Sequence, residues 1–231
     1  MNFFEIVVSS FELIFAFDKT LYEIIILSFR VSGIALIFSS IFAIILSFIL
    51  IFKSFYFKNT IIVILNSLMG IPPVLVGLVV FLLFAKDGPF GVFEILFTPY
   101  AMIIAQFIII FPIIASLSYE LFLKIWNEYR DHFRSLNIPF KGRVSIILRN
   151  SLQILFTIIM TGFGRAISEV GAIMIVGGNI ENYTRSMTTA ISLETRKGNF
   201  DYAIALGIFL ILLTILINVF VYLIKVSKKN R

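Results

Sequence analysis

The sequence predicts an all-α integral membrane protein with five transmembrane helices, and three observations support this class. Hydrophobic residues make up 60% of the 231 residues and charged residues only 14%, whereas soluble domains are about 45–50% apolar and about 25% charged. The mean hydropathy is +1.05. Five apolar segments are each long enough to cross about 30 Å of hydrocarbon, which takes about 20 helical residues. Disordered, collagen-like and disulfide-stapled chains are excluded by the same composition.

The N-terminal segment, 1–20, is expected to lie in the membrane interface. Its apolar part, 1–17, carries Glu5 and Glu12 and has no basic n-region, which argues against a cleaved signal peptide. This apolar part is short for a membrane span. An interfacial helix is therefore the first interpretation, and a sixth span is the alternative.

The five segments are separated by charged or turn-forming residues and form one transmembrane domain over 1–231. Thr98 and Pro99 are typical of an N-cap followed by proline in the first turn, so we expect a span to begin there. Gln106 lies inside that span and is expected to make an interhelical hydrogen bond. The predicted spans run over 24–52, 60–84, 99–121, 151–176 and 202–224.

The distribution of lysine and arginine predicts an N-terminus outside the cell and a C-terminus in the cytoplasm. In this orientation twelve of the 19 Lys and Arg residues lie on the inner side and five on the outer side, as the positive-inside rule requires. Loop 122–150 is then cytoplasmic and loop 177–201 extracytoplasmic. The formal net charge of +6 therefore reflects topology in the inner (plasma) membrane rather than nucleic-acid binding.

Several enzymatic classes are excluded by missing residue types. The chain has no cysteine and one histidine, so it cannot by itself build a Cys/His site for zinc, an iron–sulfur cluster or haem. It also has no Gly-x-x-x-x-Gly-Lys-Ser/Thr loop for nucleotide phosphates. We therefore expect no enzymatic activity and no cofactor in this chain.

The cytoplasmic loop 122–150 is expected to project toward a partner. The helix of the third span should continue to about Leu136 and end with Asn137 in the left-handed conformation. Ile138 precedes a proline and is expected to be extended, and a short amphipathic helix should begin after Pro139. This arrangement presents an apolar knob edged with basic residues. A basic loop that merely follows the positive-inside rule is the alternative interpretation.

Two spans contain residues that an apolar helix normally avoids. Pro72 and Pro73 should bend or break the second span. Arg165 and Glu169 lie four residues apart in the fourth span and so share a helix face. Charges inside a bilayer normally pair or line a pathway. Two interpretations stay open for each feature: a translocation pathway, or a structural role as a packing kink and an internal ion pair.

These motifs resemble permeases of ABC importers. The run DHFRSLN at 131–137 is similar to their Glu-Ala-Ala-x-x-x-Gly signature, with Asp131 in place of Glu and Asn137 in place of Gly. Other runs resemble the molybdate/sulfate/tungstate group, among them SFRVS at 28–32, GIPPV at 70–74, GPFG at 88–91 and AMIIAQ at 101–106. The run SEVGAIMIVGGNI at 168–180 and its continuation to LETRKGNF at 193–200 are most similar to tungstate-specific permeases.

The resemblance implies the membrane subunit of an ATP-driven oxyanion importer, with tungstate as the expected substrate. It also implies four partners: a second copy of the chain, two cytoplasmic ATPase subunits that bind ATP and Mg, and an extracytoplasmic oxyanion-binding protein. The residues expected to couple to the ATPase are Asp131, Phe133, Leu136, Asn137, Ile138, Pro139 and Phe140. Those expected to line the translocation pathway are Pro72, Pro73, Gly77, Arg165, Ser168, Glu169 and Gly171. A molybdate or sulfate importer is one alternative, and a self-sufficient ion channel or secondary carrier is another.

Overall fold

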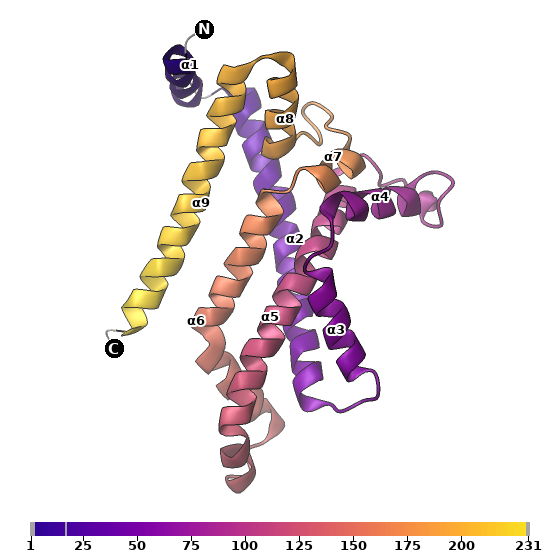
Figure 1. The fold of residues 1–231 in the computed structure, drawn as a ribbon, viewed down its shortest axis with the longest axis vertical. Helices are drawn as coiled ribbons and strands as arrows, with labels where there is room; N and C mark the ends of the chain where they lie inside the picture. The colour runs from indigo at the N-terminus through magenta and orange to yellow at the C-terminus, as the bar shows by residue number, and fades with distance from the viewer. Residues whose placement is uncertain (1–2, 17, 230–231) are drawn as a thin grey trace.

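The computed structural model describes residues 3–16 and 18–229, and every regular element in this part of the chain is helical. Residues 1, 2 and 17 of the predicted interfacial segment, and Arg231 of the predicted inner tail, lie outside the described residues. Figure 1 shows long helices side by side. The elements are α1 (Phe3–Phe15), α2 (Lys19–Phe52), α3 (Lys58–Leu68), α4 (Pro73–Phe84), a 3-10 turn η1 (Gly91–Phe93), α5 (Pro99–Ser135), α6 (Phe140–Ile167), α7 (Gly171–Gly177), α8 (Met187–Lys197) and α9 (Phe200–Lys229).

Four of these helices, α2, α5, α6 and α9, are long and apolar enough to cross a membrane. The pair α3 and α4 supplies a fifth crossing if it counts as one broken span. The all-α membrane class is therefore confirmed, and the described residues supply four or five membrane crossings. The 13 residues of α1 make about 20 Å of helix, so α1 is too short to supply a sixth span.

The N-terminal helix α1 lies across the end of α9. Figure 1 shows α1 nearly end-on beside the start of α9, which is seen lengthwise. Ser10 Oγ donates a hydrogen bond to the Asp201 carbonyl at 2.8 Å. This arrangement suits a helix in the membrane interface. The interfacial role of 1–20 stays a prediction.

The core lies between α2 and α5, where small side chains face the partner helix. Small residues let two backbones approach closely in a bilayer. Ser47 Oγ shows how close the helices are, because it donates a hydrogen bond to the Ala115 carbonyl of α5 at 3.1 Å. The buried small residues of α2 include Ser28, Ser32, Ala35, Ser39, Ala43 and Ser47.

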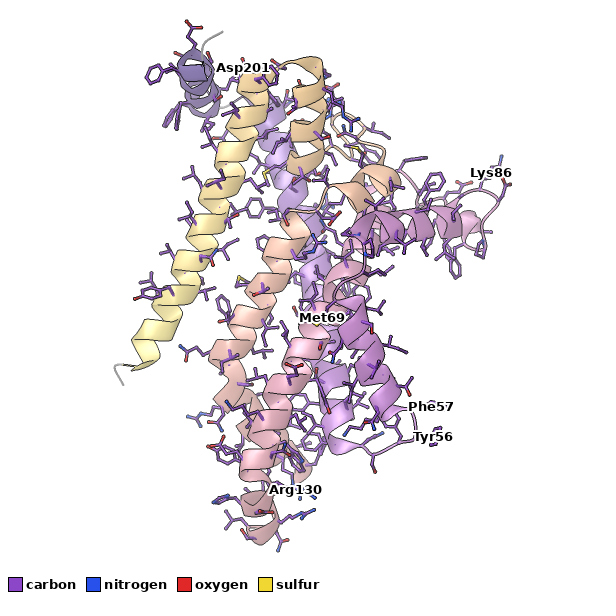
Figure 2. All side chains as sticks on the ribbon, viewed as in Figure 1. Tyr56, Phe57, Met69, Lys86, Arg130 and Asp201 are labelled. Carbon is purple, nitrogen blue, oxygen red and sulfur yellow. The ribbon has the colours of Figure 1, made fainter. Side chains whose placement is uncertain are left out.

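The second span is broken at its two prolines, as the sequence predicts. The axes of α3 and α4 differ by 109°, because a proline has no N–H and clashes with the preceding helical turn. The direction of α4 was not predicted: it leaves the bundle sideways (Figure 1). Figure 2 places Met69 at the bend and Lys86 at the far tip of the arm that α4 forms.

The fourth predicted span, 151–176, is not one helix, and this corrects the prediction. α6 ends at Ile167 and α7 begins at Gly171, because the chain between them turns to pack against α4 and α8. The short helix expected after Pro139 is also not a separate element. It is the first part of the 28-residue α6, since 143–161 contain no proline or glycine that would interrupt it.

The third span begins and continues as predicted. Thr98 Oγ1 accepts a hydrogen bond from the Tyr100 N–H at 3.2 Å, which caps the helix. α5 then runs for 37 residues, about 55 Å, well beyond the thickness of the hydrocarbon. Pro112 lies inside α5, where it leaves the Ile108 carbonyl without its usual helical donor.

The short helix α8, in loop 177–201, packs against the last span, α9. The chain turns from α8 to α9 at Gly198, whose φ of 78° favours glycine. The buried Glu194 carboxylate accepts hydrogen bonds from Lys197 Nζ at 2.8 Å and Asn199 Nδ2 at 2.9 Å. The Lys197 hydrogen bond lowers the pKa of Glu194 below its ordinary value of 4.5, against the opposing effect of burial and with further help from Asn199.

Replacing Glu194 with Gln is expected to remove an acid-sensitive contribution to stability. Because the pKa of Glu194 is lower in the folded chain, its ionised form stabilises the fold fully above the unfolded pKa, and this contribution is lost as the pH falls through the folded pKa. The measurement is thermal unfolding of the detergent-solubilised chain across acidic pH. Thr195→Val, at an exposed neighbour, should keep the wild-type pH profile; an unchanged profile in Glu194→Gln would contradict the prediction.

Candidate functional site

The candidate site lies where α6 ends and α7 begins. Arg165 and Glu169 form an ion pair, with Arg165 Nη1 3.1 Å from Glu169 Oε2, as their four-residue spacing predicts. The Glu169 side chain is 5% exposed and that of Arg165 is 37% exposed. The carboxylate is therefore enclosed, whereas the Arg165 side chain is partly exposed at the surface of the chain.

Glu169 also satisfies the backbone at the helix break. Its Oε1 accepts a hydrogen bond from the Ala172 N–H at 3.2 Å, and its carbonyl accepts one from Thr188 Oγ1 at 2.7 Å. A backbone group without a partner at membrane depth costs several kcal/mol. Glu169 therefore links α6, α7 and α8 at the point where the span is interrupted.

Hydrogen bonds from α5 and α8 fix the surroundings of the ion pair. Gln106 Nε2 donates to Ser32 Oγ at 3.2 Å and to the Ala166 carbonyl at 3.0 Å, so α5 is joined to both α2 and α6. The interhelical hydrogen bond predicted for Gln106 is confirmed. The Met187 N–H donates to Ser28 Oγ at 2.8 Å, which attaches the start of α8 to α2.

The two broken spans touch each other. A β-carbon added at Gly77 of α4 would lie 2.7 Å from the Ala172 Cα of α7, and one added at Gly171 would lie 2.6 Å from Val74 Cγ2. Both distances are well inside the optimal separation of carbon atoms, about 3.5–4.0 Å. A side chain at Gly77 would therefore press on the backbone of α7, and one at Gly171 would press on the Val74 side chain, so α4 directly contacts the segment that follows Glu169.

The structure brings together four of the seven predicted pathway residues. Gly77 and Gly171 lie at the contact of α4 with α7, next to the ion pair of Arg165 and Glu169. Their role in a pathway stays a prediction. The other three lie at the two breaks: Pro72 exposed and Pro73 half-buried at the start of α4, and Ser168 exposed after α6.

Arg30 received no role from the sequence, although it lies inside a span. It is exposed on α2 and lines a groove of about 590 Å³ together with Lys19, Glu23 and Asn182. A cation on a membrane helix is costly in lipid, so Arg30 indicates a polar surface. The position of Arg30 within an apolar segment was the one feature of the sequence that could have indicated this polar surface. Thr188 and Ser28 gave no comparable signal, because their contacts depend on the fold.

The predicted coupling segment lies at the end of α5, beyond Arg130 in Figure 2. Asn137 has a φ of 46°, which confirms the left-handed conformation expected there. The Ile138 N–H donates a hydrogen bond to the Phe133 carbonyl at 3.1 Å. This bond closes the end of α5 in the manner of a Schellman cap, so the direction of the following loop is well defined.

Two apolar side chains of this segment are exposed. Leu136 is 69% exposed and Phe140 is 60% exposed; adjacent exposed apolar groups are typical of an interaction site. Phe133, in contrast, is 1% exposed and packs against the Trp126 ring at 5.7 Å, so it positions the segment from inside. The remaining predicted contacts are Asp131, Asn137 and Pro139, which are exposed, and Ile138, which is half-buried.

Long apolar helices, with a helix break that the buried Glu169 carboxylate closes, are the features of a multi-pass membrane protein. The chain belongs to the family of binding-protein-dependent transport system inner membrane components, whose family model matches residues 36–227. The resemblance to ABC-importer permeases is therefore confirmed.

Three relatives illustrate the similarity. The chain is 38% identical to the tungstate uptake system permease protein TupB of Peptoclostridium acidaminophilum, over 93% of this chain and 94% of that protein. It is 39% identical to TupB of Campylobacter jejuni, over 72% of this chain and 70% of that protein. It is 24% identical to the putative molybdenum transport system permease protein YvgM of Bacillus subtilis, over 85% and 90% of the two chains.

Replacing Gly77 with Ala is expected to destabilise the chain by about 1–3 kcal/mol, the usual cost of overpacking. The new methyl group would force α4 away from Ala172. Thermal unfolding in detergent measures the effect. Gly164→Ala is the matched control, because a β-carbon there meets nothing within 4 Å; equal unfolding temperatures for the two variants would contradict the close contact of α4 with α7.

Proposed function

We propose that this chain is the permease subunit of an ATP-driven oxyanion importer whose substrate is tungstate. The observation that carries the substrate is the 38% identity to a tungstate uptake permease across 93% of the chain. The helical multi-pass fold and the family membership support the permease role. Molybdate is the second candidate substrate, because a putative molybdenum permease is also similar, at 24% identity.

In this proposal a partner subunit hydrolyses ATP. The chain has no phosphate-binding loop, so ATP and Mg belong to a cytoplasmic ATPase that contacts Leu136 and Phe140. The exposed basic residues Arg134 and Lys141 flank these apolar side chains and would complement an acidic rim on that ATPase. The assembly holds two ATPase subunits and an extracytoplasmic binding protein.

A second copy of the chain would cover the arm formed by α4. Val74, Leu78 and Leu82 are exposed along this arm, which leaves the bundle sideways (Figure 1). A twofold arrangement lets each arm pack against the other copy with the same contacts. The dimer would thereby place two copies of the Arg165–Glu169 pair around a common path.

The orientation follows from the basic residues and the positions of the loops. Figure 2 shows Tyr56 and Phe57 toward the same end of the molecule as Arg130, and Asp201 at the other end. The positive-inside rule assigns the end with Arg130 to the cytoplasm. The N-terminus then lies outside and the C-terminus inside, in the inner (plasma) membrane.

The Arg165–Glu169 ion pair suits a translocation pathway, in which an anion must bind and then be released. Glu169 already neutralises Arg165, so an entering dianion competes with the carboxylate for the guanidinium and binds weakly. Conduction requires binding that is favourable enough for entry and weak enough for exit. Substrate selection therefore rests largely with the binding protein. Movement of α4 against α7, driven from the coupling segment, would change the side from which Arg165 is reached.

Replacing Leu136 with Glu is expected to abolish uptake without unfolding the chain. Leu136 is 69% exposed, so the fold does not need it, whereas a charge at the centre of a protein contact typically weakens binding strongly. Co-purification of the ATPase and ATP-dependent tungstate uptake in proteoliposomes are the measurements. Tyr56→Ser, in the other inner loop at a residue 93% exposed, is the control. Normal uptake by Leu136→Glu would overturn the coupling role, and stronger uptake of molybdate than of tungstate would overturn the substrate.

Replacing Glu169 with Gln is expected to trap substrate and lower the uptake rate at least tenfold. Glutamine keeps an acceptor for the Ala172 N–H but leaves Arg165 without its counter-charge, which is costly at membrane depth. A lower tungstate concentration for half-maximal uptake, together with the slower rate, would distinguish trapping of the substrate from misfolding of the chain. The double variant Arg165→Gln/Glu169→Gln should return the half-saturating tungstate concentration to a higher value. A wild-type uptake rate in Glu169→Gln alone would rule out a pathway role.

A further inference from the structure

A groove of about 500 Å³ lies between the last turns of α2 and the first turn of α6. Its walls are mainly apolar and include Ile45, Ile49 and Phe52 from α2 and Phe140 from α6. The centroids of the Phe52 and Phe140 rings lie 4.9 Å apart, so the two helices touch within its wall. The groove is thus a built feature at the end of the molecule that carries the coupling segment.

The groove continues an apolar stripe on the outer surface of α2. Ile37, Ile41, Ile45 and Ile49 are all exposed and follow one another at four-residue intervals, so they lie on one face of the helix. An exposed stripe of isoleucine on a membrane helix faces hydrocarbon. The stripe leads into the groove and has the apolar character that an acyl chain requires.

Two cations stand where the apolar stripe ends. Lys53 follows the last residue of α2 and is exposed, and Arg143 lies in the first turns of α6. Both line the groove, and among the described residues no carboxylate lines it with them. Basic pockets between membrane helices on the cytoplasmic side attract anionic lipid head groups.

We propose that this groove binds an anionic phospholipid of the inner leaflet. One acyl chain lies along the isoleucine stripe, and the phosphate lies between Lys53 and Arg143. The charges select the ligand: a zwitterionic head group brings no net charge to offset two cations, whereas an anionic one does. The apolar length of the stripe requires a lipid rather than free phosphate.

The lipid would also brace the coupling segment. Arg143 Nε donates a hydrogen bond to the Ile138 carbonyl at 2.7 Å, so the residue that meets the phosphate also holds the loop after Asn137. Phe140, an exposed residue of the coupling segment, forms part of the groove wall. Lipid in the groove therefore supports the surface proposed to meet the ATPase. The binding itself does not depend on the transported anion.

The single tryptophan of the chain provides the test. The centroid of the Trp126 ring lies 5.1 Å from that of Phe52, a residue of the groove wall. Bromine atoms on a lipid quench tryptophan fluorescence only at close range. The purified full chain is placed in vesicles containing brominated phosphatidylglycerol or, at the same mole fraction, brominated phosphatidylcholine with the same acyl chains. We expect stronger quenching by phosphatidylglycerol than by phosphatidylcholine. Lys53→Gln should lower the affinity for phosphatidylglycerol relative to phosphatidylcholine about fivefold, because that is the contribution of one basic residue near an anionic surface.

Lys141→Gln is the matched control, because Lys141 is exposed in the same turn of α6 but does not line the groove. This variant should keep the wild-type preference, and Lys53→Glu should abolish it. Equal quenching by the two lipids would overturn the proposal, since charge would not select the occupant. Absence of quenching by either lipid would also overturn it, since protein would then cover the groove. If Lys53→Gln and Lys141→Gln lowered the preference for phosphatidylglycerol equally, general surface charge would explain the preference, and the proposed site would be overturned.

Discussion

A backbone group that leaves a helix inside hydrocarbon finds no water to bind, and this constraint organises the centre of the molecule. The fourth span opens between Ile167 and Gly171, and Glu169 meets this need twice. Its side chain accepts a hydrogen bond from the Ala172 N–H of α7, and its carbonyl accepts one from the Thr188 hydroxyl of α8. The same carboxylate pairs with Arg165. Arg165, the residue proposed to meet the substrate, is therefore connected through Glu169 to α6, α7 and α8. A change in the Arg165–Glu169 pair would act on all three helices.

Helix association in a bilayer gains little from apolar burial, because lipid is as apolar as a leucine side chain. Close fit and interhelical hydrogen bonds must hold the bundle instead. This explains why α2 turns its serines and alanines toward α5 while Phe38, Ile41 and Phe42 face outward. The same principle operates where Gly77 meets Ala172. Because Gly77 has no side chain, α4 packs closely against α7, next to the candidate site.

Local signals in the sequence predicted much of this structure. The apolar runs predict the spans, Thr98 predicts the start of α5, Asn137 predicts its end, and the spacing of Arg165 and Glu169 predicts their pairing. Each of these depends on neighbours within a few residues. The coupling and pathway roles of the chosen residues stay predictions.

The features that sequence did not predict depend on distant contacts. The direction of α4 follows from its packing on α7, and the end of α6 follows from hydrogen bonds with α8. Phe133 was expected at the ATPase surface because it lies inside the signature run, but Trp126 and Tyr129 enclose it. In a chain with 60% hydrophobic residues, an apolar residue alone does not distinguish a lipid face, a partner surface and a core.

The length of α5 has a mechanical consequence. A helix of 37 residues is a stiff rod of about 55 Å, and its two ends lie at the coupling segment and beside the α4–α7 contact. Pro112 divides this rod into a shorter arm toward the contact and a longer arm toward the ATPase surface, with one helical hydrogen bond missing at the division. The rod is weakest in bending at that point. A sideways push on the long arm is therefore partly taken up by bending at Pro112, so the short arm moves less than the long arm.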